Sequence, residues 1–297
     1  MKKTSILHLI TAAKHASPFD INMAFDAGYE HIIPYADVSL NEVLALSQDA
    51  IFSRSPSGIK REALFFGGRD IHLALDMQKA ACGAMFSPFE ISTFSDPSGA
   101  FTTAAAMVAK VDAHLQSRQQ SLAGETVAIF GASGAVGSTA ALIAAKQGAN
   151  VQLMAHRDVA SMQAYASKLA QRYGVSLGVL DGLSAAAKKV ALDQAGVAFC
   201  ASPAGVRVLA LADFIESPSL KVVADVNAVP PLSIEGVDVM CNGALVAGTQ
   251  IAGFGALAIG QLKYVTQHAL LVAMLGHETV MHIDYHDAFD FARANVQ

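Results

Sequence analysis

The chain has 297 residues, of which 53% are hydrophobic and 15% charged, and its formal net charge is −5. This length exceeds the usual single core of roughly 100 to 200 residues, so we expect two domains with a large interior. No basic stripe interleaved with aromatic residues is present, which argues against a nucleic-acid partner. The cysteines, Cys82, Cys200 and Cys241, show neither metal-ligand spacing nor a disulfide framework, which is typical of a reducing compartment.

The first ten residues begin with M-K-K but contain only a short apolar run that His8 interrupts. Such a run is too short for a signal peptide or a membrane segment. We therefore expect a cytoplasmic protein without a membrane partner. The low charge density and the high content of alanine and glycine favour a homo-oligomer in which part of the surface is hidden.

Apolar periodicity predicts alternating strands and helices along the chain. Before a polar stretch at 112–125, we expect strands at 6–10 and 63–66 and helices at 70–82 and 102–115. After it, we expect strands at 127–130, 151–155, 176–180, 197–201 and 222–226, and helices at 139–146, 159–173 and 185–194. A last helix is expected at 284–296, with Asp284 as its N-cap. The order is typical of an α/β fold with a doubly wound parallel sheet.

The polar stretch also indicates where the two domains meet, with a linker near 115–124. We expect one domain over 1–118, completed by a C-terminal helix within 270–297. The second domain is expected over 119–269.

A glycine turn stands at 126–137, T-V-A-I-F-G-A-S-G-A-V-G, between a buried strand and a helix. Gly131 allows the tight turn, Gly134 lets the backbone approach a pyrophosphate, and Gly137 lets the helix lie close to the strand. The helix N-terminus offers N–H groups and partial positive charge to an anion. This context favours dinucleotide binding over a merely tight strand–helix turn. The predicted cofactor-binding residues here are Gly131, Ala132, Ser133, Gly134, Ala135, Val136 and Gly137.

The second predicted strand of this domain ends in His156 and Arg157, where NAD-binding proteins usually carry an acidic residue. A guanidinium suits a ribose 2′-phosphate, because its planar fork donates two charge-assisted hydrogen bonds. The sequence therefore favours NADP. Asp158 follows directly, so NAD remains possible, and Arg157 could also be an ordinary loop residue.

Ligands of open parallel sheets collect beyond the carboxyl ends of the strands. One such end leads into Ala201, Ser202 and Pro203, small residues against which a nicotinamide could lie. Another leads into Asn227, whose amide could reach the edge of the ring. A third stretch, 253–260, is small and apolar and precedes Lys263. Each of these stretches could equally be architectural.

Two polar turns stand out in the first domain. The first, D-P-S-G-A-F-T-T at 96–103, is a turn followed by a helix whose first residues carry hydroxyl groups, and it could hold a polar ligand. The second, S-P-F-D at 17–20, ends in Asp20. Both could also be simple capped turns.

Besides the glycine turn, the chain contains S-P-F-D at 17–20, D-P-S-G-A-F-T-T-A-A-A at 96–106, D-V-N-A-V-P-P at 225–231 and G-A-L-A-I-G-Q-L-K at 255–263. In the order and spacing of these motifs, it resembles the bacterial NAD(P)-dependent methylenetetrahydromethanopterin dehydrogenases and the related methylenetetrahydrofolate dehydrogenases. The resemblance spans nearly the whole chain. It implies a Rossmann-like domain beside a second α/β domain, a reduced pterin in the cleft between them, and a homo-oligomer, as a trimer or higher.

The implied reaction is hydride transfer from methylenetetrahydromethanopterin to NADP or NAD, a step of formaldehyde oxidation in one-carbon metabolism. No general base is required, because nitrogen lone pairs of the pterin expel the hydride, and catalysis rests on orientation and electrostatics. On this resemblance the catalytic residues are Lys263 and Asp20. The substrate-binding residues are Asp96, Ser98, Gly99, Thr102, Thr103 and Gly255.

Other functions remain open at this point. Methylenetetrahydrofolate could be the substrate, and a non-catalytic, nicotinamide-binding redox sensor would keep the glycine turn. A short-chain reductase is disfavoured, because Tyr165 and Lys168 are one residue too close for its Tyr-x-x-x-Lys pair. His282 and His286, one helical turn apart, could bind zinc, although a solvated helix start is the simpler interpretation and no metal is expected.

Overall fold

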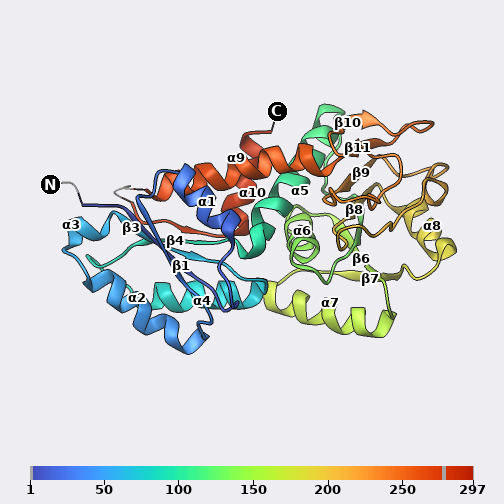
Figure 1. The fold of residues 1–297 in the computed structure, drawn as a ribbon. Helices are drawn as coiled ribbons and strands as arrows, with labels where there is room; N and C mark the ends of the chain where they lie inside the picture. The colour runs from blue at the N-terminus through green and yellow to red at the C-terminus, as the bar shows by residue number, and fades with distance from the viewer. Residues whose placement is uncertain (1–2, 276–278, 297) are drawn as a thin grey trace. The chain divides into compact units, whose positions relative to one another are not determined.

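The computed structural model describes residues 3–275 and 279–296, and the chain divides into two compact units. The first unit comprises the residues up to Thr102 together with Tyr264–Phe291. The second comprises Thr103–Lys263 and the segment from Ala292 onwards. Figure 1 follows the chain from the N-terminal to the C-terminal end.

The first unit is built on a five-stranded sheet with the order β12-β4-β3-β1-β2, in which all pairings are parallel. Every residue of the strands at 62–66 and 92–95 is buried, as expected for a parallel sheet that is covered on both faces, although 92–95 is mostly polar in sequence. The strands are β1 (Ile6–Ile10), β2 (His31–Tyr35), β3 (Glu62–Phe66), β4 (Ser92–Ser95) and β12 (His282–Ile283).

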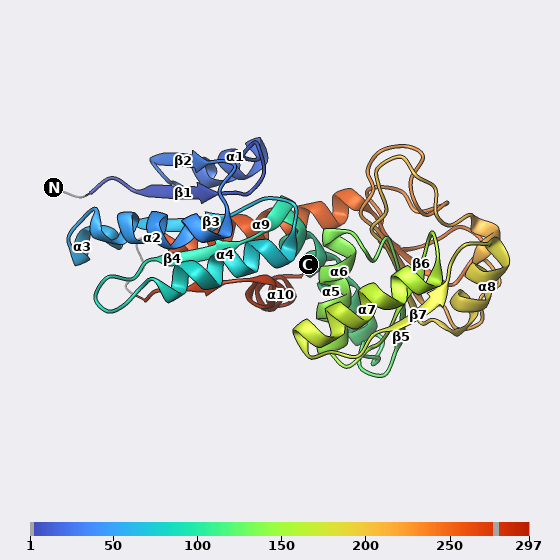
Figure 2. The ribbon, with the colours of Figure 1, turned by 90° about the horizontal axis from the view of Figure 1, so that it is seen from below.

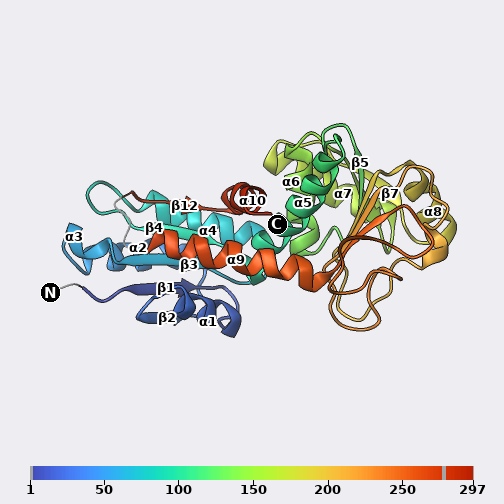
Figure 3. The same cartoon turned by 90° about the horizontal axis from the view of Figure 1, so that it is seen from above.

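Helices cover both faces of this first sheet. Helices α1 and α9 lie on one face, and α2 and α4 lie on the other (Figures 1 and 3). On the α2 and α4 side, a core forms around Ile51, Phe66 and Met77. The helices of this unit are α1 (Pro18–Asp26), α2 (Val43–Phe52), α3 (Pro56–Ile59), α4 (Ile71–Gly83), the later part of α9 (Ala256–Met274) and α10 (Tyr285–Ala294) up to Phe291. Two short 3-10 turns, η1 (Leu40–Glu42) and η2 (Pro97–Gly99), also belong to it.

The second unit contains a seven-stranded sheet with the order β10-β11-β9-β8-β5-β6-β7. All its pairings are parallel except β10 with β11, which is antiparallel. The strand order reverses between β5 and β8, so this is a doubly wound sheet with a switch point at the end of β5. The strands are β5 (Thr126–Phe130), β6 (Asn150–Ala155), β7 (Gly178–Asp181), β8 (Val197–Cys200), β9 (Val222–Asp225), β10 (Asn242–Leu245) and β11 (Ala252–Phe254).

Helices α5 (Ala100–Ser117), α6 (Ala135–Lys146) and α7 (Val159–Tyr173) lie on one face of this sheet, and α8 (Ala185–Gln194) lies on the other (Figure 2). Phe130 and Cys200 point to the α8 side, where they join Leu192 and Phe214, which follows the 3-10 turn η3 (Leu211–Asp213), in one buried core. The predicted α/β architecture with a doubly wound parallel sheet is confirmed.

Most predicted strands and helices of the second unit are found within a few residues of their expected ends, and α7 and α8 have the predicted bounds. The division of the chain differs from the sequence-based one. The linker expected near 115–124 begins inside α5, and all of α5 from Thr103 onwards belongs to the second unit. The expected C-terminal segment 270–297 includes residues 276–278 and 297, which lie outside the described residues. Of its described part, β12 pairs with β4 in the first sheet.

The stretch 253–260 differs from its prediction as a loop beyond a strand. Residues 252–254 form β11, and helix α9 begins at Ala256. Gly255 lies between them, where a Cβ would overlap the backbone of Asp238 and Val239. The small residues therefore allow a close approach of two backbone segments, which explains why the stretch lacks bulky side chains.

Candidate active site

The glycine turn joins three backbone segments at the switch point of the second sheet. Gly131 follows β5 with a φ of +75°, and a Cβ at this position would overlap the backbone carbonyl of Ala201 beyond β8. A Cβ at Gly137, in the first turn of α6, would overlap the carbonyl of Gly131. Only glycine fits either position, so the turn brings the start of α6 against the ends of β5 and β8.

The N-terminus of α6 is open to a ligand. Gly134 is its N-cap and provides no side-chain hydrogen bond. Within the described part of the chain, no acceptor is found for the N–H groups of Ala135 or Val136. Since the first N–H groups of a helix have no partner inside the helix, a diphosphate oxygen can accept from them. The turn thus fits the dinucleotide predicted from its sequence.

A cavity of about 680 Å³ lies beside this turn, at the carboxyl ends of β5, β6 and β8. Its volume is typical of a site for a small molecule or cofactor. Eight of the predicted cofactor-binding residues line it: Gly131, Ser133, Gly134, His156, Arg157, Ala201, Ser202 and Pro203. Five do not line it: Ala132, Ala135, Val136, Gly137 and Asn227. The structure therefore brings together the ends of three strands that are separated by up to 70 residues in the sequence.

A second cavity, of about 380 Å³, shares Ser133, His156 and Arg157 with the first and extends to the start of α7. Arg157 is exposed, and no hydrogen bond or ion pair of its guanidinium is found among the described residues. By contrast, Asp158 caps α7 by accepting from the Ser161 N–H at 2.6 Å, and this hydrogen bond lowers the pKa of its carboxyl group. The Arg157 guanidinium is thus available to a phosphate, whereas the Asp158 carboxylate is already bonded to the N-terminus of α7.

Two further cations line the larger cavity, and the sequence analysis missed both. Lys188 of α8 donates from Nζ to the Val208 carbonyl at 2.6 Å. Arg207 donates from Nε to the Leu232 carbonyl at 2.5 Å. Neither residue belongs to a motif or follows a predicted strand end directly, so only the folded chain reveals them. Arg207 also pairs with Glu235 at 3.7 Å, so Lys188 and Arg157 are the lining cations without a carboxylate partner among the described residues, and they favour an anion in the cavity.

Asn227 was predicted to offer its amide to the cofactor, but the loop itself uses this amide. Its Oδ1 accepts from the N–H groups of Val229 at 2.9 Å and Gly205 at 3.4 Å, and its Nδ2 donates to the Pro231 carbonyl at 3.1 Å. Asp225 next to it is buried and accepts from Asn227, Ser233 and Ile234 backbone N–H groups. Burial raises the pKa of the Asp225 carboxyl group, and these hydrogen bonds oppose the rise. Both residues hold the loop beyond β9 in place.

In the first unit, Asp96 caps the start of α5. Its Oδ1 accepts from the N–H groups of Phe101 and Thr102, and its Oδ2 accepts from the Thr102 hydroxyl at 2.6 Å. The carboxyl group is fully buried. Ser98 is exposed, has a φ of +55° and donates to the Gly68 carbonyl at 2.7 Å. Gly99 follows it with a φ of +63°. A serine in the left-handed region is strained, and such strain occurs often at functional sites.

Asp20 lies in the first turn of α1 and is 3% exposed. Its Oδ1 accepts from Nε2 of Gln267 in α9 at 3.0 Å. Lys263 lies four residues before Gln267 in the same helix, and residues with this spacing share one face of a helix. Lys263 is 8% exposed and is therefore not a surface lysine. Thr103, another predicted substrate-binding residue, is half-buried in α5.

The structure does not place His282 and His286 one helical turn apart, as a zinc site between them would require. His282 lies in β12 and His286 in α10, so no helical turn relates them. Nδ1 of His282 lies 3.0 Å from the Thr93 hydroxyl and 3.3 Å from Sγ of Cys82. In residues 3–275 and 279–296, no group of three or more His, Cys, Asp or Glu side chains could hold a metal ion. In the same residues, no helix is long and apolar enough to cross a membrane.

Solved structures support the architecture. Shikimate 5-dehydrogenase from Listeria monocytogenes, solved with shikimate and NAD, aligns with a TM-score of 0.53 and 16% identity over 93% of each chain. Ornithine carbamoyltransferase from Pyrococcus furiosus aligns with a TM-score of 0.55 and 12% identity over 94% of this chain and 87% of that one. At these identities the likeness concerns the fold alone.

Sequence comparison identifies the family. Residues 18–98 match the family described as methylene-tetrahydromethanopterin dehydrogenase, N-terminal. The bifunctional protein MdtA of Methylorubrum extorquens is 31% identical over 258 residues, 87% of this chain and 88% of that protein. The NAD(P)-dependent methylenetetrahydromethanopterin dehydrogenase of the same organism is 42% identical over 289 residues, 97% of each chain. The chain therefore belongs to the methylenetetrahydromethanopterin dehydrogenase family.

Proposed function

We propose that the protein is an oxidoreductase that transfers a hydride from methylenetetrahydromethanopterin to NADP, and less readily to NAD. The product is methenyltetrahydromethanopterin, and the reaction is a step in formaldehyde oxidation. The observation that carries the proposal is the uncapped start of α6 beside the exposed Arg157, in a chain that is 42% identical to a named enzyme of this kind. The expected architecture, family and cofactor class all agree with it.

The second unit would hold the cofactor. The N–H groups of Ala135 and Val136 would donate to the diphosphate, and Arg157 would pair with a 2′-phosphate. The loop at 201–203 would form the surface for the nicotinamide, while Asn227 would keep that neighbourhood rigid through its three backbone contacts. When bound, the nicotinamide supplies a carbon, C4, that accepts the hydride.

The residues proposed to act on the pterin are Asp20 of α1 and Lys263 of α9. Lone pairs on the two pterin nitrogens expel the hydride, so the protein has to supply orientation and a suitable field rather than a base. We propose Asp20 as the carboxylate that stabilises the positive charge developing between these nitrogens. Lys263 would donate a hydrogen bond that orients the ring. The bond from Gln267 fixes the direction of the Asp20 carboxyl group.

The polar turn before α5 would bind the rest of the substrate. Ser98, Gly99 and Thr102 are proposed to form its contacts or to shape the backbone around it, and Thr103 and Gly255 stay separate proposals for substrate binding. Asp96 belongs to this set as a positioning residue, because its carboxylate already accepts bonds from Phe101 and Thr102.

The direct experiment is an assay of NADP and NAD reduction with the purified protein. We expect the absorbance of the reduced nicotinamide to rise with methylenetetrahydromethanopterin, faster with NADP than with NAD. Activity only with methylenetetrahydrofolate would support the alternative dehydrogenase. Binding of NADP without reduction by either pterin would support a redox sensor, and absence of both binding and reduction would refute the proposal.

We also propose that the protein works as a homo-oligomer in the cytoplasm. The free thiols of Cys82, Cys200 and Cys241 agree with a reducing compartment. Three large side chains of α9 are well exposed, namely Tyr264 at 44%, Val265 at 49% and Val272 at 42%, and they give the first unit an apolar surface that a second copy could cover. Light scattering coupled to size-exclusion chromatography would test the assembly; a mass of one chain would contradict it.

A further inference from the structure

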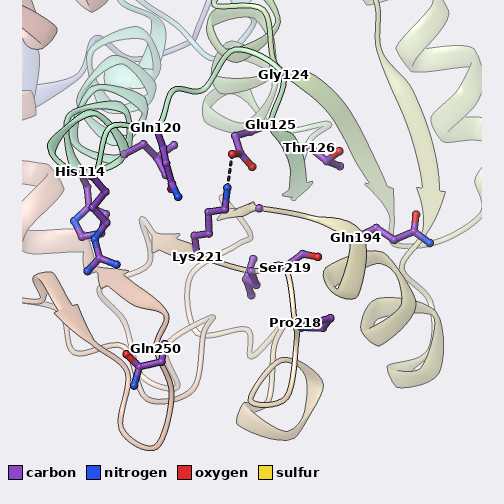
Figure 4. A pocket seen from close by; sticks show the side chains of 14 residues that line it. His114, Gln120, Gly124, Glu125, Thr126, Gln194, Pro218, Ser219, Lys221 and Gln250 are labelled. Atoms are coloured by element: carbon purple, nitrogen blue, oxygen red, sulfur yellow. Dashed lines mark hydrogen bonds and ion pairs between the residues drawn. The ribbon is translucent and has the colours of Figure 1, made fainter.

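A separate cavity of about 480 Å³ lies at the amino-terminal edge of the second sheet, opposite to the edge that carries the glycine turn (Figure 4). Its lining includes Thr126 at the start of β5, Gly196 just before β8 and Lys221 just before β9. It shares no residue with the two cavities at the carboxyl ends of the strands. The proposed reaction gives this cavity no role.

The lining carries more positive than negative charge. Lys221 and Glu125 form a close ion pair at its centre, and Figure 4 shows this pair with the amide of Gln120 directed towards it. The other charged side chain of the lining is Arg118, directly after α5. In the described part of the chain, no carboxylate lies within ion-pair distance of its guanidinium. One cation of the cavity therefore has no counter-charge.

His114 provides an unused polar atom in the same wall. Its Nε2 is buried and has no hydrogen-bond partner among residues 3–275 and 279–296, while its ring packs edge-on against Phe254 with the ring centres 5.7 Å apart. Burial and the nearby charge of Arg118 lower the pKa of this imidazole. A buried polar atom without a partner is costly, and native proteins usually satisfy it with water, an ion or a ligand.

We infer that this cavity binds a small anion that carries a carboxylate or phosphate group. Arg118 is its ion-pair partner, because the guanidinium fork matches both groups. Nε2 of His114 and the amides of Gln120 and Gln250 supply neutral hydrogen bonds. A bound anion would contact the amino ends of β5, β8 and β9, and the carboxyl ends of the same strands carry the cofactor loops. Because the anion binds only the folded unit, it stabilises that unit by mass action.

The test is calorimetric titration of the full chain with inorganic phosphate and, separately, with citrate, at constant ionic strength. The variant Arg118→Gln removes the proposed partner. Lys146→Gln is the matched control, because Lys146 is also an exposed cation at the end of a helix but lies outside the cavity. Arg157→Ala removes a cation beside the glycine turn. This variant tests whether the phosphate binds at the glycine turn instead of in this cavity.

We expect saturable binding of one or both anions, weakened about 10-fold or more by Arg118→Gln and less than about twofold by the other two variants. Binding of phosphate alone or of citrate alone identifies the group that the site prefers. The pKa of His114 can be followed by NMR in protein with isotope-labelled histidine. The anion should raise this pKa in the wild type but not in Arg118→Gln. The inference is overturned if neither anion binds, if Lys146→Gln weakens binding as much as Arg118→Gln does, or if binding disappears in Arg157→Ala. These measurements need no turnover, so they stand apart from the proposed reaction.

Discussion

Replacement of Arg157 by alanine tests the cofactor preference most directly. The guanidinium is exposed, lines both cavities beside the glycine turn and has no partner among the described residues. Its loss removes a charge-assisted contact to a 2′-phosphate, which is worth about 1.5–3 kcal/mol in total. The dissociation constant for NADP should therefore rise about 10- to 150-fold. That for NAD, which lacks this phosphate, should change less than about threefold, within what a lost surface contact explains.

The assay is fluorescence or calorimetric titration of each cofactor, with the wild type, Arg157→Ala and the control Arg172→Ala. Arg172 is an arginine at the end of α7, and its guanidinium lies 5.6 Å from the ring centre of Tyr173. The control should leave both affinities unchanged. Equal losses for NADP and NAD in Arg157→Ala would refute the assignment of the 2′-phosphate. Lys188 is the next candidate, because it lines the same cavity.

Three further variants test other parts of the site. Lys263→Ala should lower the turnover number about 10-fold or more while NADP affinity stays within about twofold, and an unchanged turnover number would remove this residue from catalysis. Gly137→Ala should cost about 1–3 kcal/mol of stability and weaken cofactor binding, since its Cβ overlaps the Gly131 carbonyl; an unchanged thermal midpoint would contradict this. His114 has a lowered pKa in the folded state, so the stability it contributes is present above pH 6.5 and is lost as the pH falls below that value. His114→Gln should therefore lose less thermal stability than the wild type between pH 7.5 and pH 5, whereas the exposed His15→Gln should behave as the wild type.

The second unit was largely predictable from the sequence because its signals are local. Asp158 caps α7, and Ser184 caps α8, so both helices begin where their N-cap residues indicate. Strand β5 is a continuous apolar run that ends at the φ-positive Gly131, and only glycine fits that turn. In each case, one residue type at one position satisfies a backbone requirement, which is the kind of information a single sequence carries.

The first unit was less predictable because its elements depend on neighbours that are distant in the sequence. Strand β2 contains Pro34 and is half exposed, a pattern tolerated at the edge of a sheet but unlike a buried strand. Strand β12 has two residues and exists through its pairing with β4, almost 190 residues earlier. Helix α9, whose first residues belong to the second unit, likewise begins with small residues that resemble a loop. None of these elements has a strong local signal.

The candidate site shows the same division. The sequence indicated Arg157 because it follows a predicted strand, but it could not indicate Lys188 or Arg207, which reach the cavity from α8 and from a loop beyond β8. It suggested that Asp96 and Asn227 contact ligands, and the structure shows that Asp96 already accepts from Phe101 and Thr102 and that Asn227 already bonds to its own loop. Polar residues in turns serve caps as readily as ligands, and only the folded chain distinguishes the two uses.

The fold by itself leaves the chemistry open, because an ornithine carbamoyltransferase and a shikimate dehydrogenase both align with this chain at TM-scores above 0.5. The glycines do not decide it alone either. Gly131 and Gly137 are required where backbones touch, so their replacement would damage the turn whether or not a cofactor binds there. Arg157 differs from them, since it is exposed and supports no neighbouring backbone. A selective loss of NADP affinity in its alanine variant would therefore report on the ligand itself, free of any effect on folding.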